Sequence, residues 1–175
     1  MLTFLEPEKI IEQIDLKQDW HSAEFGCGQG GFTIELARAL PKGIIYALDI
    51  QEEPLSALLG RAKVEGLSNI KTIQCNLEEP NGSTLQDNSL DLVLVTNILF
   101  QSDKKEQMLK EAKRILKPGG EIVVVDWKKD SPFGPEDGRV GLEEIEKLMR
   151  LKLSIKLIKE IKADTYHWSA IFKKE

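Results

Sequence analysis

The stretch Glu24-Phe25-Gly26-Cys27-Gly28-Gln29-Gly30-Gly31 follows a short apolar segment and precedes residues 32–40, whose apolar positions recur at helical spacing. Glycine-rich turns between a strand and a helix let backbone N–H groups approach a ligand where a side chain would collide. The glycines satisfy two patterns at once, G-x-G-x-G, which ends at Gly30, and the dinucleotide pattern G-x-G-x-x-G, which ends at Gly31. The motif alone therefore leaves the kind of ligand open.

Apolar runs alternate with amphipathic segments on both sides of this turn. We predict strands at 21–25, 43–50, 70–75, 90–95 and 121–127, and helices at 32–40, 51–66 and 104–116. Asp103 and Glu106 have the spacing of a capping box for the last of these helices. Runs such as LDLVLV are typical of strands buried on both faces of a parallel sheet. The alternation predicts a doubly wound α/β fold with a mostly parallel sheet.

The two ends of the chain give weaker signals. Glu6-Pro7, followed by isoleucines at helical spacing, predicts a short helix within residues 1–20. The apolar residues after Gly141 fit either one long helix or a helix followed by a strand. We favour a helix over 141–150, a strand over 155–161, and a final strand over 166–172 that pairs with it.

Composition excludes several classes of protein. The chain has 175 residues, enough for one ordinary domain, and its net charge of -5 argues against a broad basic surface for nucleic acid. Two cysteines far apart, Cys27 and Cys75, fit a reducing compartment, so we expect a cytoplasmic protein in which both are small core residues. No secretion signal, membrane-spanning run or cluster of metal-ligating residues is apparent, and we expect no metal.

Asp49, at the end of the strand expected over 43–50, fits either glycine pattern, since an acid there can accept both hydroxyls of a ribose. Glu24 separates the two patterns, because a carboxylate beside the turn suits a positively charged amino group better than a pyrophosphate. The short chain also leaves few residues for the substrate domain of a nicotinamide enzyme. Both features favour an amino-acid nucleoside over a dinucleotide.

The order of motifs supplies a third feature. The glycine loop, Asp49, a polar turn at 75–77, Asn97 after the strand 90–95, and 116–120 before the next strand together resemble class I S-adenosylmethionine-dependent methyltransferases. The segments AEFGCGQGGFTIELA, YALDIQ, SLDLVLVTNILFQ and RILKPGGEIVVVDWKK are similar to the small-molecule branch near the ubiquinone and menaquinone C-methyltransferases. This resemblance implies a single Rossmann-like domain over 1–175, with three αβα layers and sheet order 3-2-1-4-5-7-6, the last strand antiparallel. Residues 1–20 would form a short helical lid.

The resemblance also implies S-adenosylmethionine as cofactor, S-adenosylhomocysteine as product and a small-molecule acceptor. Asp49 would hold the ribose, and backbone amides of the glycine loop would form a cradle beside it. The residues expected to contact the cofactor are Glu24, Gly26, Cys27, Gly28, Gly30, Asp49, Ile50, Asn76, Leu77 and Asn97. Ile50 and Leu77 would sandwich the adenine. Asn76, where relatives commonly carry an acid, would accept from the adenine amino group.

Methyl transfer from a sulfonium needs an aligned nucleophile more than it needs covalent catalysis by the protein. If the acceptor must lose a proton, a base near the ends of the fourth and fifth strands would help, and the candidates are Asp126, His167 and Tyr166. The long loop 127–139 is a candidate to line or gate the acceptor pocket through Phe133 and Arg139, although a surface loop stiffened by prolines is an alternative.

Two other functions remain open at this point. A module that binds S-adenosylmethionine without catalysis fits the absence of an unmistakable base. A nicotinamide oxidoreductase rests on Gly31 alone. A homodimer that covers an open pocket is compatible with the short lead-in, although no residue demands it.

Overall fold

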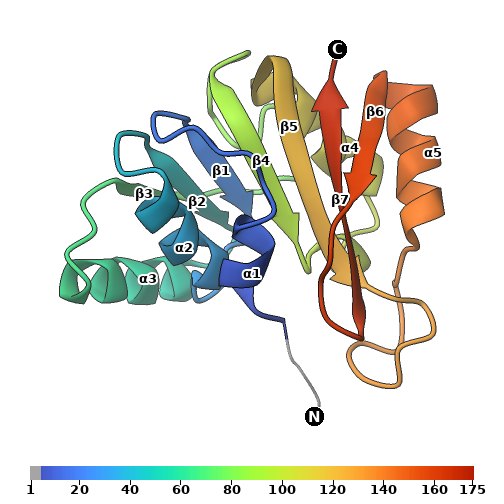
Figure 1. Ribbon diagram of the computed structural model, residues 1–175, viewed down its shortest axis with the longest axis horizontal. Helices are drawn as coiled ribbons and strands as arrows, with labels where there is room; N and C mark the ends of the chain where they lie inside the picture. Colours follow the sequence, from blue (N-terminus) through green and yellow to red (C-terminus); the bar gives the residue numbers. More distant parts are fainter. Residues whose placement is uncertain (1–4) are drawn as a thin grey trace.

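The structure is a computed structural model and describes residues 5–175. In this part of the chain seven strands form one sheet with the order β3-β2-β1-β4-β5-β7-β6, in which β7 runs antiparallel to both neighbours (Figure 1). The strands are β1 (Ser22–Phe25), β2 (Ile45–Asp49), β3 (Ile70–Gln74), β4 (Leu90–Thr96), β5 (Leu116–Trp127), β6 (Ile155–Glu160) and β7 (His167–Lys174). The predicted fold class, strand order and antiparallel last strand are confirmed.

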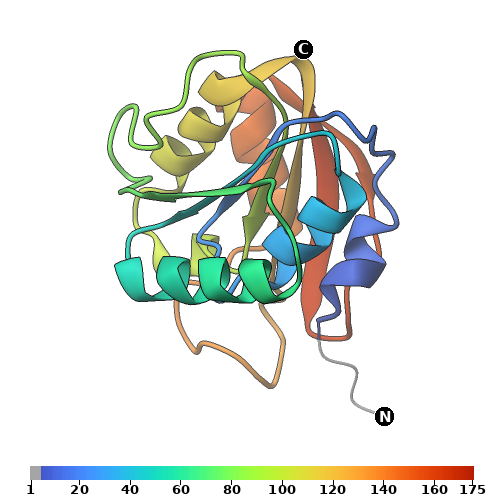
Figure 2. The same cartoon turned by 90° about the vertical axis from the view of Figure 1, so that its left-hand side faces the viewer.

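The helices cover both faces of the sheet. Figure 2 shows α4 and α5 on one side of it and α1 and α2 on the other. The helices are α1 (Pro7–Ile11), α2 (Gly31–Ala39), α3 (Glu52–Val64), the 3₁₀ turn η1 (Leu99–Gln101), α4 (Lys105–Ile115) and α5 (Leu142–Leu153). Each side has its own apolar cluster, one built on α4 and α5 and one on α1, α2 and α3. This gives the three predicted layers.

Several boundaries differ from those expected. The start of α4 has no capping box, because Ser102 Oγ accepts the Lys104 N–H at 3.0 Å and Lys104 itself occupies the N-cap position without a side-chain cap. Strand β5 begins at Leu116 rather than 121, since Leu116 already pairs with Leu90 across an irregular register. Strand β7 starts at His167 and continues to Lys174. The spacing of apolar residues indicates which positions are buried. The ends of these helices and strands are determined by backbone hydrogen bonds instead.

The segment after α1 joins the beginning of the chain to its last strands. The Gln13 side chain accepts the Lys162 N–H and donates to the Lys162 carbonyl, each at 2.8 Å, although 149 residues separate them. Helix α1 packs beside α2, and Pro7 lies next to Gly31. Of the expected lid 1–20, residues 1–4 lie outside the described residues.

The carboxyl ends of the parallel strands form one edge of the sheet, the lower edge in Figure 1. The loop between β5 and α5, residues 128–141, extends from this edge and is called the β5–α5 loop below. Ligands of open α/β sheets bind outside the carboxyl ends of the strands, so this edge positions the site. Across residues 5–175, no helix combines the length and apolar character that a membrane crossing requires.

Candidate functional site

The glycine loop is tied to β2 by its own backbone. The N–H groups of Gly26 and Cys27 both donate to the Leu48 carbonyl, at 2.8 and 3.0 Å, and the Gly30 N–H donates to the Cys27 carbonyl at 2.8 Å. The backbone amides of residues 26–30 were expected to form a cradle, and these three donate within the protein instead. They fix the shape of the loop.

Asp49 accepts a further amide of the loop, that of Gly28. Its Oδ2 accepts the Gly28 N–H at 3.0 Å, and its Oδ1 accepts the Gln51 N–H at 3.0 Å. Each carboxylate oxygen can accept more than one hydrogen bond, so both keep a free lone pair. Asp49 therefore joins the loop after β1 to the start of α3 and still presents acceptors to a ligand.

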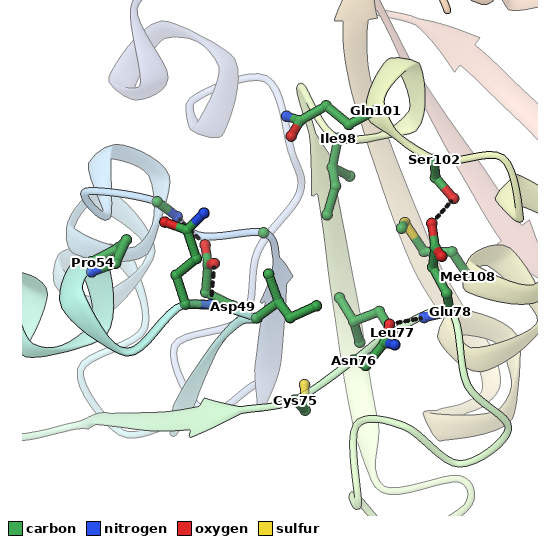
Figure 3. A pocket seen from close by; sticks show the side chains of 14 residues that line it. Asp49, Pro54, Cys75, Asn76, Leu77, Glu78, Ile98, Gln101, Ser102 and Met108 are labelled. Carbon is green, nitrogen blue, oxygen red and sulfur yellow. Dashed lines mark hydrogen bonds between the residues drawn. The ribbon is translucent and has the colours of Figure 1, made fainter.

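A cavity of about 460 Å³ opens between these loops (Figure 3). Small-molecule sites usually fall between about 300 and 1,000 Å³. Six of the ten predicted cofactor residues line it: Gly26, Gly28, Asp49, Ile50, Asn76 and Leu77. Ile50 is 61% exposed while Leu77 is buried, so an apolar side chain stands open at the rim. No described residue before Gly26 contributes to the lining, so α1 does not cover this cavity.

Gly28 shows how closely a ligand can approach the backbone. It has φ of +48°, and a Cβ placed on it would meet nothing within 4 Å, whereas a Cβ on Gly26 would lie 2.5 Å from Ile98 Cδ1. The open space above Gly28 belongs to the cavity that this residue lines. A side chain there would fill room that the structure leaves for a ligand.

Four predicted residues lie outside the cavity lining: Glu24, Cys27, Gly30 and Asn97. Burial raises the pKa of the Cys27 thiol well above its usual range, with the carboxylates of Glu24 and Asp49 adding to the effect. Cys27 is therefore not a thiolate nucleophile. Gly30 begins α2 from a left-handed conformation. These two residues shape the loop.

Glu24 is a buried carboxyl group with hydroxyl partners. It is 2% exposed, its Oε1 accepts the Thr96 hydroxyl at 2.9 Å, and its Oε2 accepts the Thr33 hydroxyl. Burial raises the pKa of Glu24 to about 7, although the hydrogen bonds from Thr33 and Thr96 act in the opposite direction. No cation among residues 5–175 forms an ion pair with it. A bound ammonium group nearby would offset the cost of its charge.

The threonine partners were not predicted. Thr33 comes from α2 and Thr96 from the last position of β4, so the glutamate joins three elements that converge at the carboxyl edge. A hydroxyl residue at the end of an otherwise apolar strand, as in LDLVLVT, is the signal that would have found Thr96. Thr33 has no comparable signal.

Asn97 follows β4 in a conformation that is uncommon for residues other than glycine. Its φ is +50°, and its Oδ1 is buried without a hydrogen-bond partner in the described part of the chain. Residues held in the left-handed region concentrate at ligand sites. An unpartnered buried oxygen costs about 1–3 kcal/mol, which a ligand donor would recover.

Asn76 is held differently from the expectation. Its Oδ1 accepts the Glu78 N–H at 3.0 Å, and Glu78 Oε1 in turn accepts the Ser102 hydroxyl at 2.6 Å (Figure 3). The amide oxygen keeps one further lone pair, and the side-chain Nδ2 is free to donate to a ligand. The Glu78–Ser102 contact closes one side of the cavity and was not predicted.

Asp126 is fully buried at the end of β5. Its Oδ2 accepts the Leu99 N–H at 3.0 Å and its Oδ1 accepts the Trp127 N–H at 2.8 Å. Burial raises the pKa of Asp126 to about 6, while the backbone hydrogen bonds act to lower it. The carboxylate holds η1 in place and does not line the cavity.

His167 forms a pair with a residue that was not predicted. Its Nδ1 lies 2.8 and 3.0 Å from the two oxygens of Asp164, and its ring centroid is 4.0 Å from that of Trp127. Tyr166 is buried, and its ring meets that of Phe133 edge-on at 5.1 Å. Asp164 lies three residues before His167, the spacing of a side chain that accepts from backbone amides of its own turn.

Arg139 organises the β5–α5 loop from inside. Its guanidinium donates to five carbonyls of the loop: Lys128, Lys129, Ser131, Phe133 and Pro135. The side chain was expected to line or gate an acceptor pocket. Its donors are directed to the loop itself, so any effect on an acceptor passes through the loop conformation.

The residues present fit a nucleoside that carries an amino acid. Asp49 offers acceptors for hydroxyl groups, Gly28 leaves space for close approach, and the buried carboxyl of Glu24 lacks a cation. Among residues 5–175, no three His, Cys, Asp or Glu side chains are arranged to hold a metal ion.

Comparison with known proteins agrees with this geometry. Residues 17–172 match the methyltransferase domain family, and the chain belongs to that family. The demethylmenaquinone methyltransferase of Geobacillus kaustophilus is 30% identical over 128 residues, which is 73% of this chain and 53% of that protein. The chain thus spans about half the length of such relatives. The predicted resemblance is confirmed.

Solved structures show the same fold. An S-adenosylmethionine-dependent methyltransferase from Aquifex aeolicus superposes with a TM-score of 0.87 at 22% identity, covering 98% of this chain and 91% of the other. The [4+2]-cyclase SpnF superposes with a TM-score of 0.82 at 14% identity, covering 96% and 79%. The fold alone therefore does not establish which reaction a member performs.

Proposed function

We propose that this chain transfers a methyl group from S-adenosylmethionine to a small aromatic acceptor. The observation that carries the proposal is the cavity at the carboxyl edge, where Asp49 and the open space above Gly28 lie together in a methyltransferase domain. The relative from Geobacillus kaustophilus is named a demethylmenaquinone methyltransferase, and its name supports an acceptor that carries an aromatic ring. The nicotinamide alternative has no support from the family match.

Each of the predicted residues would bind a different part of S-adenosylmethionine. Asp49 would hold the ribose, Ile50 and Leu77 the two faces of the base, and Asn76 its edge. Glu24 would act on the methionine amino group through its charge, because its oxygens already accept from two hydroxyls. When bound, S-adenosylmethionine supplies a sulfonium methyl group that is already activated. The protein's contribution is alignment and the exclusion of water.

A pair of glycine substitutions tests the cavity. Gly28→Ala adds a methyl group where nothing lies within 4 Å, at φ +48°, and Gly66→Ala does the same at φ +70° beyond the end of α3. The left-handed backbone should cost each variant about 1–2 kcal/mol of unfolding free energy. We expect only Gly28→Ala to lower the affinity for S-adenosylhomocysteine, at least tenfold by calorimetry.

Equal affinities in the two variants would show that the nucleoside does not occupy this cavity. Titration with NAD in place of S-adenosylhomocysteine should give no heat. Transfer of label from S-adenosylmethionine to any acceptor separates an enzyme from a module that binds without catalysis. Turnover should persist after chelation, which tests the predicted independence of metal.

We also propose that the chain forms one methyltransferase domain and works in the cytoplasm. Both cysteines are free thiols in the structure, which supports a reducing compartment. A homodimer remains a prediction, and light scattering of the purified protein tests it.

A further inference from the structure

Two buried polar atoms lack partners at the carboxyl edge. They are Asn97 Oδ1, directly after β4, and His167 Nε2, at the start of β7; in residues 5–175 neither atom has a hydrogen-bond partner. The two strands are the neighbours of β5 in the sheet. Buried polar atoms in native proteins are almost always paired, so unpaired ones at a ligand edge call for an explanation.

Asp164 fixes the state of the imidazole. Its Oδ1 accepts the N–H groups of Tyr166 and His167, at 2.8 and 2.7 Å, as well as contacting His167 Nδ1. Burial alone would raise the pKa of Asp164, but the hydrogen bonds from the His167 ring and the two amides outweigh it and lower the pKa. A carboxylate can only accept, so Nδ1 carries a proton and, in the neutral ring, Nε2 is an acceptor.

The strand register places His167 on the same face of the sheet as Glu24. Glu24 is paired with Leu94, and Thr96, two residues further, is paired with Val125. Two residues beyond Val125, Trp127 is paired with His167. Side chains two residues apart in a strand point to the same face. The histidine therefore faces the side of the sheet that also carries the glycine loop and its carboxylates.

The β5–α5 loop closes over this end of the strands. A Cβ on Gly134 would lie 2.5 Å from the Trp127 ring, so the backbone of the loop packs directly on the indole. The indole packs in turn on the His167 ring. Residues 128–141 contain neither helix nor strand, and Arg139 supplies five of the hydrogen bonds that hold them. Nε2 is itself buried, so a ligand reaches it only when the groups packed around the ring move.

We propose that His167, held by Asp164, is the hydrogen-bond acceptor and proton acceptor for the hydroxyl group of a neutral aromatic acceptor. The inference rests on the proposed function and names the acceptor chemistry for it. An acceptor nitrogen at Nε2 requires a donor on the ligand, and the adjacent Asp164 carboxylate disfavours an anionic one. The rings of Trp127, Tyr166 and Phe133 suit an aromatic ligand.

The proposed step balances without a further reactant. The phenolic oxygen forms a bond to the methyl carbon as the carbon–sulfur bond of the donor breaks, and the sulfur leaves as a neutral thioether. The phenolic proton moves to His167 Nε2. Asp164 stabilises the resulting imidazolium, and it acts as a positioning residue because it reaches the acceptor only through the ring.

Proton NMR of the whole chain tests the contact without any activity measurement. The sequence has two histidines, and His21 lies just before β1, at the other end of the strands, where its Nδ1 accepts the Ile44 N–H at 3.0 Å. With S-adenosylhomocysteine bound, 1-naphthol should shift the ring signals of His167 and leave those of His21 unchanged. The ether 1-methoxynaphthalene, which lacks the hydroxyl proton, should bind at least tenfold more weakly.

Two substitutions separate the roles of the pair. His167→Asn keeps a donor for Asp164 and removes Nε2, so it should weaken 1-naphthol binding at least tenfold. Asp164→Asn should present its amide nitrogen to Nδ1, because its oxygen must still accept from two amides, and so reverse the tautomer. The nitrogen shifts of His167 report that reversal. His21→Asn is the matched control and should bind 1-naphthol as the wild type does.

Methylation rates give a further test. A residue with a purely structural role would slow the methylation of all acceptors equally. In His167→Asn, methylation of 1-naphthol should fall more than that of the more acidic 4-nitrophenol, which needs less help to lose its proton. Unmoved His167 signals on addition of 1-naphthol, with S-adenosylhomocysteine still bound, would overturn this inference alone. Failure of the wild type to bind S-adenosylhomocysteine would overturn the proposed function and the inference together.

Discussion

The two sides of the carboxyl edge differ in how completely their polar groups are paired. Beside β1 and β2, the oxygens of Glu24 and Asp49 and four loop amides all have partners within the protein. Beside β4 and β7, Asn97 Oδ1 and His167 Nε2 have none in the described residues. The polar groups of the first side are paired within the protein, and the second side offers these two unpaired buried atoms to a ligand. We associate the first with a fixed cofactor and the second with the acceptor.

Among the substitutions considered, loss of the Asp49 carboxylate should have the largest effect on cofactor binding beside β1 and β2. Asp49→Ala removes two charge-assisted hydrogen bonds that hold the loop and the acceptors offered to a ribose. We expect an affinity loss for S-adenosylhomocysteine of about 100-fold, close to 3 kcal/mol. Calorimetry measures it, and the exposed Asp15→Ala is the control. An unchanged affinity would place the nucleoside elsewhere.

Glu24 makes the first side sensitive to pH. A carboxyl with a pKa raised from 4.5 to about 7 binds protons more tightly in the folded chain, so stability falls as pH rises from about 4.5 to 7 and levels off above it. This group accounts for a loss of roughly 3 kcal/mol at most. Glu24→Gln should lack that part of the pH dependence in denaturant unfolding at pH 5 and pH 8.

The same variant has an opposite effect on binding. Without the carboxylate, the positive amino group of S-adenosylhomocysteine loses its counter-charge, and we expect about tenfold weaker binding at pH 8. Asp126, whose pKa is raised to about 6, is untouched and leaves a residual slope of the same sign. A variant with unchanged slope and unchanged affinity would remove Glu24 from both roles.

Substitution of Arg139 tests the region beside β4 and β7, which the β5–α5 loop covers. Arg139→Ala removes five donors to loop carbonyls, and we expect faster amide hydrogen exchange in residues 128–141 and about 1–2 kcal/mol less stability. Affinity for S-adenosylhomocysteine should stay within about twofold, because the loop does not line the nucleoside cavity. A large loss of that affinity would show that the two sides are coupled.

The smallest expected effect lies at Asn76. Asn76→Asp keeps an oxygen for the Glu78 N–H and replaces the free Nδ2 with a second acceptor. One added hydrogen bond to the adenine amino group is worth about 0.5–1.5 kcal/mol, or roughly 2–10-fold. Competition between S-adenosylhomocysteine and S-inosylhomocysteine measures this preference, which should favour adenine more strongly in the variant.

The sequence predicted the strands, the helices and the glycine loop well, because each of them is indicated by a run of neighbouring residues. Strand order followed from the family resemblance and from alternating runs. Six of the ten residues predicted to contact the cofactor line one cavity, and their contact with a cofactor stays a prediction. The partners Thr33, Ser102 and Asp164 were missed. Each meets its carboxylate or imidazole through the folded chain or a turn, and polar residues of these types are common on any surface.

The sequence also could not show which groups were already occupied. The amides at 26, 27, 28 and 30 look available in a glycine-rich turn, yet Leu48, Asp49 and Cys27 take all four. Asp126 has the position expected of a base, but it is fully buried and its oxygens accept the backbone amides of Leu99 and Trp127. Whether an amide or a carboxylate already has a hydrogen-bond partner depends on how the strands lie beside one another. The sequence of a single segment does not show this.

The Gln13 contact with Lys162 has a consequence for synthesis of the chain. During synthesis the backbone of Lys162 is made 149 residues after Gln13, whereas α2, against which α1 packs, is made soon after α1. The packing of α1 on α2 can therefore form long before the Gln13 hydrogen bonds do. A fragment truncated before residue 162 keeps the first contact and lacks the second.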